Sequence, residues 1–557
     1  MTDMRRTLLW VVFSMSLVLL WDAWNKHQGE PSMFGPRTTA PAAAPSAAPS
    51  PPATTAVPAP ATPAAPAAAA TPGAVPAAPP VPNAQITATT DLVKATFDVQ
   101  GGTLVRLELL RHADPLDPKR NVVVFDRSAQ RVYAAQTGLI APGVTLPNHL
   151  TVMSVVPGET TLKDGVDALD ITFESPEVGG VKLRKTWTLK RGSYLMNVAH
   201  EVVNSGSAAV QPQLYLQLMR DGNPPEGESS FYFTFTGPAM YTEAAKFRKI
   251  EFKDIEKNKA ELDKSASEGW IAMVQHYFTS AWLIPPNTPR EYRVAKVSDN
   301  LYSIAMVHTL PSVAPGAVVK AQAQLYAGPQ EEDKLEALAP GLELVKDYGW
   351  FTPLAKPLFW LLTKLHTLTG NWGWAIVALV VVLKIAFYWL NHKAYASMAK
   401  MKAINPRVME LRERLKDNPQ QMQQEMMRIY REEKVNPLGG CLPILVQMPF
   451  FIALYWVLLS SVEMRNAPWI GWITDLSAKD PFYVLPLLMT ASSLLQTWLN
   501  PTPPDPMQAR MMWMMPLMFS VMFFFFPAGL VLYWLTNNIL SIAQQWFINK
   551  RLGVLGK

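Results

Sequence analysis

A 21-residue apolar segment, Asn371–Asn391, constrains this chain more than any other feature of its sequence. At about 1.5 Å per residue, it is long enough to cross the hydrocarbon core of a bilayer as a helix. Its only charge is Lys384, about 10 Å from the Asn391 end on that rise. An ammonium at that depth is unfavourable unless its stem reaches the nearer membrane surface or it faces a water-filled pocket between helices. Both interpretations predict a membrane helix, and the remaining chain favours the pocket.

Further apolar runs indicate an α-helical polytopic membrane protein. The 557 residues are too many for one ordinary domain, and 49% are hydrophobic whereas only 17% are charged. We predict six transmembrane helices. Five of them form a core over residues 371–557, with spans at about 371–391, 438–462, 482–499, 511–526 and 530–548. The single cysteine, Cys441, excludes an intramolecular disulfide bond.

The sixth span is an N-terminal anchor over residues 1–25, where Arg5 and Arg6 precede an apolar run. Because basic residues favour the cytoplasmic side of a membrane, we expect both chain termini in the cytoplasm. The next segment, 26–83, is rich in Pro and Ala. Such a composition cannot bury a core, so this segment is predicted to be an extended tether.

Residues 84–336 show short segments of alternating apolar and polar residues. One segment ends in Leu189, and Arg191–Ser193 then turns the chain into Tyr194, Met196 and Val198. Repeated period-2 segments over about 250 residues predict a large antiparallel β-sandwich. Because it follows an anchor whose N-terminus is inside, this domain is expected outside the cytoplasm.

Two amphipathic regions flank the Asn371–Asn391 segment. Residues 337–370 carry leucines on one face and Lys356 and Lys364 on another, which predicts a helix lying in the outer membrane interface. Residues 392–435 are basic and predict a cytoplasmic helical hairpin. Its charged faces are either solvated surface or a docking site for ribosomal RNA or acidic nascent chains. The candidate docking residues are Lys400, Lys402, Arg407, Arg412 and Arg414.

Polar residues and methionines recur inside the predicted spans. Singly, the polar groups are explained as links between helices and the methionines as apolar filler facing lipid. Together they indicate a groove that offers polar groups and an adaptable apolar surface. The polar candidates are Lys384, Gln447, Gln496, Asn537 and Asn538, and the apolar candidates are Phe450, Met511, Met515, Met518 and Met522.

Catalytic and cofactor-binding signatures are not found in the sequence. The histidines are too far apart to suggest a metal pair, and no nucleophile-elbow, zinc-protease or P-loop motif occurs. We therefore predict a protein that is not an enzyme and needs no cofactor.

Several motifs together resemble the YidC family of membrane protein insertases, in its Gram-negative form with a large periplasmic domain. They are GNWGW (370–374), YASMAKM (395–401), EKVNPLGGC (433–441), QMPFF (447–451), DPMQ (505–508) and FPAGLVLYW (526–534), with YAGP (326–329) ending the β-rich region.

The resemblance implies an inner-membrane protein with a periplasmic, supersandwich-like β-domain. It implies insertion and folding of nascent membrane proteins, alone or with the Sec translocon and without nucleotide. The family's groove carries a positive residue, usually Arg, at the position of Lys384. Tyr533 and Trp534 match substrate-contacting positions, and Gln447 matches a groove-lining one. The six residues after Arg551 are shorter than the basic tails of some relatives, so any ribosome contact is expected at the hairpin.

Two other classes remain as alternatives. An intramembrane lysine also suits an ion-coupled transporter or channel with an extracytoplasmic sensor domain. Such proteins are expected to show internal repeats or paired broken helices, which are not evident here. A membrane-anchored enzyme acting on sugars would leave five spans without a role.

Overall fold

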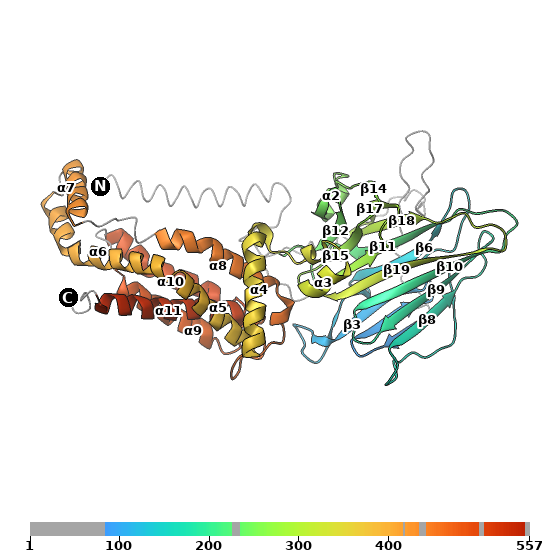
Figure 1. The fold of residues 1–557 in the computed structure, drawn as a ribbon, viewed down its shortest axis with the longest axis horizontal. Helices are drawn as coiled ribbons and strands as arrows, with labels where there is room; N and C mark the ends of the chain where they lie inside the picture. Colours follow the sequence, from blue (N-terminus) through green and yellow to red (C-terminus); the bar gives the residue numbers. More distant parts are fainter. Residues whose placement is uncertain (1–83, 226–233, 416–417, 434–441, 501–505, 552–557) are drawn as a thin grey trace, which may run out of the picture. The chain divides into compact units, whose positions relative to one another are not determined.

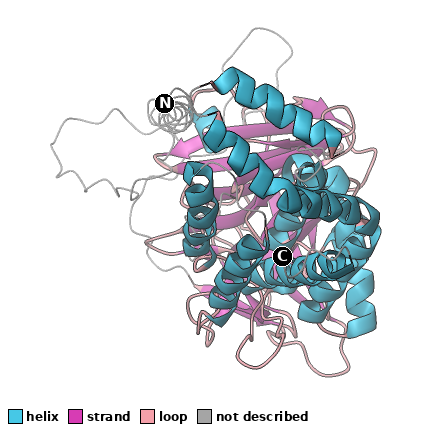
Figure 2. Ribbon diagram, turned by 90° about the vertical axis from the view of Figure 1, so that its left-hand side faces the viewer, coloured by secondary structure: helices cyan, strands magenta, loops and turns pink. Residues whose placement is uncertain are grey.

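The computed structural model describes residues 84–225, 234–415, 418–433, 442–500 and 506–551. The predicted anchor, the tether and Cys441 lie outside these ranges. Within them, every named strand falls between Gln85 and Pro329, and long helices follow from Thr352 onwards (Figures 1 and 2). By contacts, residues 506–515 group apart from the other residues that the structure describes. This segment forms the start of a helix.

The β-rich region contains two antiparallel sheets, as the alternation predicts. The first has the order β1 (Gln85–Thr89), β2 (Val93–Asp98), β3 (Thr103–Ala113), β6 (Val132–Ile140), β11 (Gln213–Asp221), β18 (Leu301–Thr309), β17 (Arg290–Ser298) and β14 (Ser265–Ala266), with β4 (Asn121–Val123) on β3 and β5 (Asp126–Arg127) on β6. The second has the order β13 (Lys246–Lys249), β12 (Gly237–Thr242), β15 (Trp270–Val274), β16 (Phe278–Leu283), β19 (Val318–Pro329), β10 (Leu195–Asn204), β9 (Val181–Lys190), β8 (Ala168–Glu174) and β7 (Ser154–Val155).

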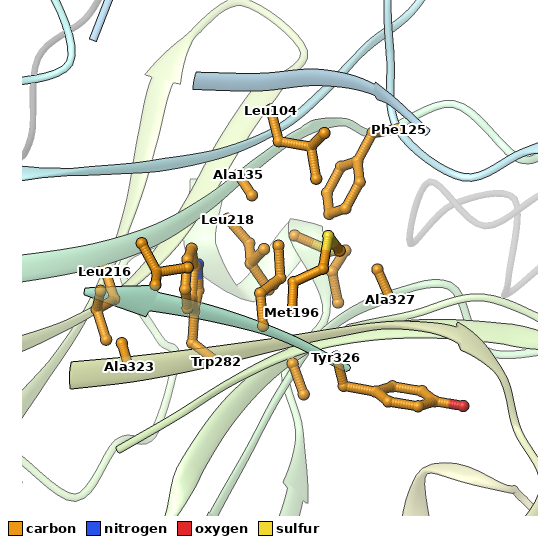
Figure 3. Close-up of a cluster of buried hydrophobic side chains, with 14 of the residues drawn as sticks. Leu104, Phe125, Ala135, Met196, Leu216, Leu218, Trp282, Ala323, Tyr326 and Ala327 are labelled. Carbon is orange, nitrogen blue, oxygen red and sulfur yellow. The ribbon is translucent and has the colours of Figure 1, made fainter. Parts of the chain in front are cut away.

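The core of the sandwich lies between these sheets. Figure 3 shows Leu104 and Phe125 meeting Met196 and Trp282 across the interior. The Trp282 indole also donates a hydrogen bond across the interior, to the Gln217 carbonyl at 3.1 Å. Packing one face of a sheet against the other sheet explains the alternation in β9 and β10, whereas β6 and β11 are buried along nearly their whole length.

The hairpin between β9 and β10 confirms the predicted turn. Gly192 has φ +68°, a left-handed conformation that glycine adopts without a steric penalty. The strands it joins pair in register, with Leu189 opposite Met196 and Trp187 opposite Val198.

Helices make up the chain after β19. Their bounds are α3 (Glu332–Leu338), η1 (Leu342–Val345), η2 (Gly349–Phe351), α4 (Thr352–Thr369), α5 (Trp372–Ala386), α6 (Tyr388–Arg414), α7 (Pro419–Glu432), α8 (Leu442–Ser460), η3 (Val462–Met464), α9 (Val484–Leu499), α10 (Pro506–Phe523) and α11 (Ala528–Arg551). The short α2 (Phe252–Glu256) belongs to the β-rich region.

The predicted span 371–391 is divided in the structure. It becomes α5 and the start of α6, which meet at Phe387 with a bend of 69°. Taken together, the bent pair is long and apolar enough to span a membrane, whereas no single described helix is. Shorter apolar helices are α9, residues 446–460 of α8 and residues 509–523 of α10. Because the bend follows Lys384 closely, the lysine lies in the last turn of α5 rather than inside a long helix.

Many large apolar side chains of these helices point outward. Such an area is unusual on a protein surrounded by water and is typical of a surface that contacts lipid or another protein. The most exposed of them are Leu368, Ile385, Trp389, Trp498, Met518 and Val521.

Candidate functional site: a polar pocket at the bend

A pocket forms where α5 and α6 meet, against α8 and α11. It is lined by Val380, Leu383, Lys384, Phe387, Asn391, Gln447, Phe450, Phe451, Tyr533 and Asn537. Its volume of about 20 Å³ holds about one water molecule. The pocket is therefore a site for a small polar group and does not accommodate a whole helix.

The position of Lys384 has a local electrostatic cause. At the C-terminal end of a helix the backbone carbonyls point outward, and this end stabilises a cation by about 0.3–1 kcal/mol. The bend brings such an end to Lys384, whose ammonium donates a hydrogen bond to the Ser541 hydroxyl of α11 at 2.6 Å. The cation is thus held at a helix end and on a neutral partner.

A second polar pair, Gln447 and Asn391, also lines the pocket. The Gln447 amide of α8 donates to the Asn391 side-chain carbonyl of α6 at 2.6 Å. Asn391 is buried, and its own amide nitrogen has no hydrogen-bond partner among the described residues. A buried donor without a partner costs free energy, so this amide favours a water or another hydrogen-bond acceptor in the pocket.

Aromatic rings form the remaining walls. Phe387 meets Phe450 edge to face at 5.0 Å between ring centroids, and Phe451 lies 6.0 Å from Tyr533. Tyr533 is only 2% exposed, so its ring faces the interior between the helices rather than the outer surface of the helical region. These walls reduce the access of water and strengthen the field of the cation.

The structure brings together some predicted residues and separates others. Lys384, Gln447, Asn537, Tyr533 and Phe450 line one pocket. Trp534, also expected in the groove, packs its ring on Phe523 and Phe526 instead.

Gln496 is not among the residues that line this pocket. Asn538 donates to the Ser492 and Ser493 hydroxyls of α9, so it links two helices. Asn537 therefore lines the pocket, whereas its neighbour Asn538 contacts α9. The sequence alone did not separate these two roles on one helix.

The predicted apolar residues of α10 differ in exposure. Met511, Met515 and Met518 are 40%, 48% and 65% exposed, whereas Met522 packs partly buried against the helical core. The exposed methionines suit contact with lipid or with varied apolar segments.

The predicted docking residues lie along α6. Lys400, Lys402, Arg407 and Arg414 are exposed. Arg407 pairs with Glu432 and Glu433 at the end of α7, at 3.7 and 3.2 Å. One of the five candidate cations is therefore used to hold the two helices together.

The GNWGW motif acts at the opposite end of α5. The Asn371 side chain caps the helix by accepting from the Trp374 amide, and its own amide donates to the Pro468 carbonyl at 2.8 Å. A Cβ atom on Gly373 would lie 2.2 Å from the Trp469 ring. The motif thus fastens the loop after α8 onto the start of α5.

Comparison with known proteins finds relatives along nearly the whole length of the chain. Residues 85–361 match the YidC periplasmic domain, and residues 364–554 match the 60Kd inner membrane protein family. A membrane protein insertase YidC of Cupriavidus necator is 54% identical over 551 residues, covering 99% of this chain and 98% of that protein. The corresponding protein of Burkholderia orbicola is 51% identical over 559 residues, covering 100% and 99%.

Solved structures give weaker matches. A crystal structure of an active YidC insertase with the first transmembrane domain resolved is 19% identical, with a TM-score of 0.38, covering 82% of this chain and 91% of that one. A galactose mutarotase related enzyme from Lactobacillus acidophilus is 11% identical, with a TM-score of 0.29, covering 44% of this chain and 97% of that one.

Proposed function

The chain belongs to the YidC family of membrane protein insertases, and from this premise we propose that it inserts nascent inner-membrane proteins through the pocket around Lys384. The observation that carries the proposal is the lone ammonium beside a buried, unpartnered amide at a bent helix. Both groups suit the polar or acidic end of a client segment.

The attraction is strong enough to matter. Two opposite charges 4 Å apart attract by about 1 kcal/mol in water but by about 4 kcal/mol at an effective dielectric constant of about 20. The aromatic walls favour the second regime. A client carboxylate that enters from the cytoplasm is therefore drawn to Lys384, while the ammonium loses little by exchanging one polar partner for another.

The apolar part of the client then leaves sideways into lipid. Exposed apolar side chains on α5 and α10, such as Ile385 and Met518, offer a surface for this movement. Burial of about 20 apolar residues in the bilayer supplies the driving force, so the step needs no nucleotide.

The finer parts of the proposal concern topology and partners. The β-rich region is assigned to the periplasm, both termini to the cytoplasm, and residues 392–435 to a cytoplasmic hairpin. Buried Val408 and Ile429, together with the Arg407 ion pairs, support a hairpin that folds as a unit. The Sec translocon and, through α6, the ribosome are the proposed partners.

Crosslinking a stalled client tests the function. A photoreactive amino acid at Gln447 or Met518 should capture the client's membrane segment, whereas one at exposed Val318 on β19 should not. Equal capture at Val318, or none at Gln447, would contradict the proposal. The ion-coupled transporter predicts instead an ion flux in liposomes that depends on Lys384, with no client capture.

A further inference from the structure

Lys384 is a flexible cation, so its surroundings decide where its ammonium lies. An arginine in its place would present a planar fork that is rigid and offers several donors in a fixed geometry. A lysine ammonium on a four-carbon stem has many rotamers and must be held in place by its surroundings. The structure shows one group that does so, the Ser541 hydroxyl at 2.6 Å.

Ser541 is itself fixed. Its hydroxyl lies 2.7 Å from the Asn537 carbonyl oxygen, one turn earlier in α11, and donates its proton there. The lone pairs of the oxygen are then left for donors, and Lys384 is one of them. Because Ser541 is 4% exposed, water competes little for these contacts.

We propose that Ser541 is a positioning residue that holds the Lys384 ammonium at the pocket between client arrivals. The hydroxyl oxygen accepts a hydrogen bond from one of the three ammonium protons and leaves two protons for a client carboxylate. A neutral hydroxyl suits this task, because a carboxylate partner would compete with the client for the charge. The inference rests on the proposed function and adds to it the group that holds the flexible lysine in place.

The test uses the full-length protein in proteoliposomes and two clients that differ only in the translocated end, which carries Asp in one and Asn in the other. Ser541→Ala should lower insertion of the Asp client about fivefold, the value of one hydrogen bond, and lower insertion of the Asn client less than about twofold. Ser541→Thr keeps the hydroxyl, so this variant should insert the Asp client at a rate within about twofold of that of the unsubstituted protein.

Ser520→Ala is the matched control. Ser520 is also buried in a helix and also donates to the carbonyl one turn earlier, that of Pro516 at 2.6 Å. Loss of its hydroxyl should not discriminate between the two clients. In a Lys384→Arg background, Ser541→Ala should cost less than about twofold, because the guanidinium needs no such partner.

Equal losses for both clients, no rescue by threonine, or an unchanged Asp client after Ser541→Ala would overturn the positioning role. A Lys384→Ala variant separates this failure from that of the proposed function. If Lys384→Ala discriminates between the clients and Ser541→Ala does not, only the positioning role fails. If Lys384→Ala does not discriminate either, the proposed function fails.

Discussion

Lys185 in the β-sandwich and Lys384 in the helical region are held in different ways. Lys185 on β9 is 1% exposed, and its ammonium donates to two backbone carbonyls, those of Gly101 at 2.5 Å and Thr137 at 3.2 Å. Lys384 is half-buried, lines a pocket and donates to one hydroxyl. Two backbone carbonyls are fixed by the fold, whereas a single hydroxyl leaves the ammonium able to bind a second acceptor. The difference fits a structural role for Lys185 and is compatible with the role proposed for Lys384.

The surroundings of Lys185 support this distinction. Burial lowers the pKa of Lys185 to about 7. Nearby, His200 hydrogen-bonds to the Thr137 hydroxyl at 2.9 Å, and His149 to the Tyr215 hydroxyl at 2.6 Å. Burial, and then the charge of Lys185, lowers the pKa of His149 to about 4. This cluster is polar but closed, so it contributes to the stability of the sandwich and offers no entrance for a client.

The largest expected effect is on the stability of the sandwich. Lys185→Ala removes a long buried side chain and leaves two carbonyls without their donor, so the free energy of unfolding should fall by about 4 kcal/mol. Pulse proteolysis of the full-length protein measures it, with exposed Lys182 on the same strand changed to Ala as the control. A loss below about 1 kcal/mol, or an altered preference between Asp and Asn clients, would remove the contrast between the two lysines.

Lys384→Ala should have the next largest effect, and on insertion rather than on stability. Half of the roughly 4 kcal/mol attraction is expected to be offset by desolvation of the client carboxylate, so insertion of an Asp-ended client should fall about 30-fold. An Asn-ended client should lose far less, and Lys384→Arg should preserve both. Rates of insertion into proteoliposomes measure the two losses, and equal losses for both clients would remove the charge from the mechanism.

The smallest expected effect is the pH dependence contributed by His149. In the unfolded chain a histidine binds a proton below about pH 6.5, whereas folded His149, facing Lys185, Arg127 and Tyr215, does so only near pH 4. The unfolded state therefore binds more protons as the pH falls, and stability falls with it. Between pH 7 and pH 5.5 this amounts to about 1 kcal/mol.

His149→Gln should reduce that loss by about 1 kcal/mol, because glutamine does not titrate and still accepts from Tyr215. His308→Gln is the control, since His308 lies near the end of β18, where its ring hydrogen-bonds to the Pro289 backbone carbonyl. The free energy of unfolding of each variant, measured at about pH 7 and about pH 5.5, tests this prediction. An unchanged pH dependence in His149→Gln would show that this histidine is not kept neutral by the fold.

The sequence predicted the sandwich because its signals are local. Period-2 alternation and Gly192 specify strands and a turn without knowledge of distant residues. Lys185 was within reach of the same reasoning, since it occupies an inward position in phase with Leu183 and Trp187. His200 likewise shares the phase of Val198 and Val202 on β10. A polar residue at an inward position is a signal for a buried polar cluster.

The pocket could be predicted only in part. The charge of Lys384 and the polarity of Gln447 and Asn537 are visible in the sequence. The bend at Phe387 is not, because neither proline nor glycine lies there and the helix pattern continues through it. The Ser541 contact joins residues 157 positions apart, so no local pattern reveals it.

Solid-state NMR of lysine side-chain nitrogens in bilayers shows directly whether the Lys384 ammonium lies in a wet pocket, on which the proposed mechanism depends. Lys384→Arg and Lys185→Arg variants assign the two signals. We expect rapid proton exchange with water for Lys384, slow exchange for Lys185, and no dephasing of either signal by lipid phosphorus. A Lys384 signal that is dephased by phosphorus would place the ammonium among the headgroups and contradict the mechanism.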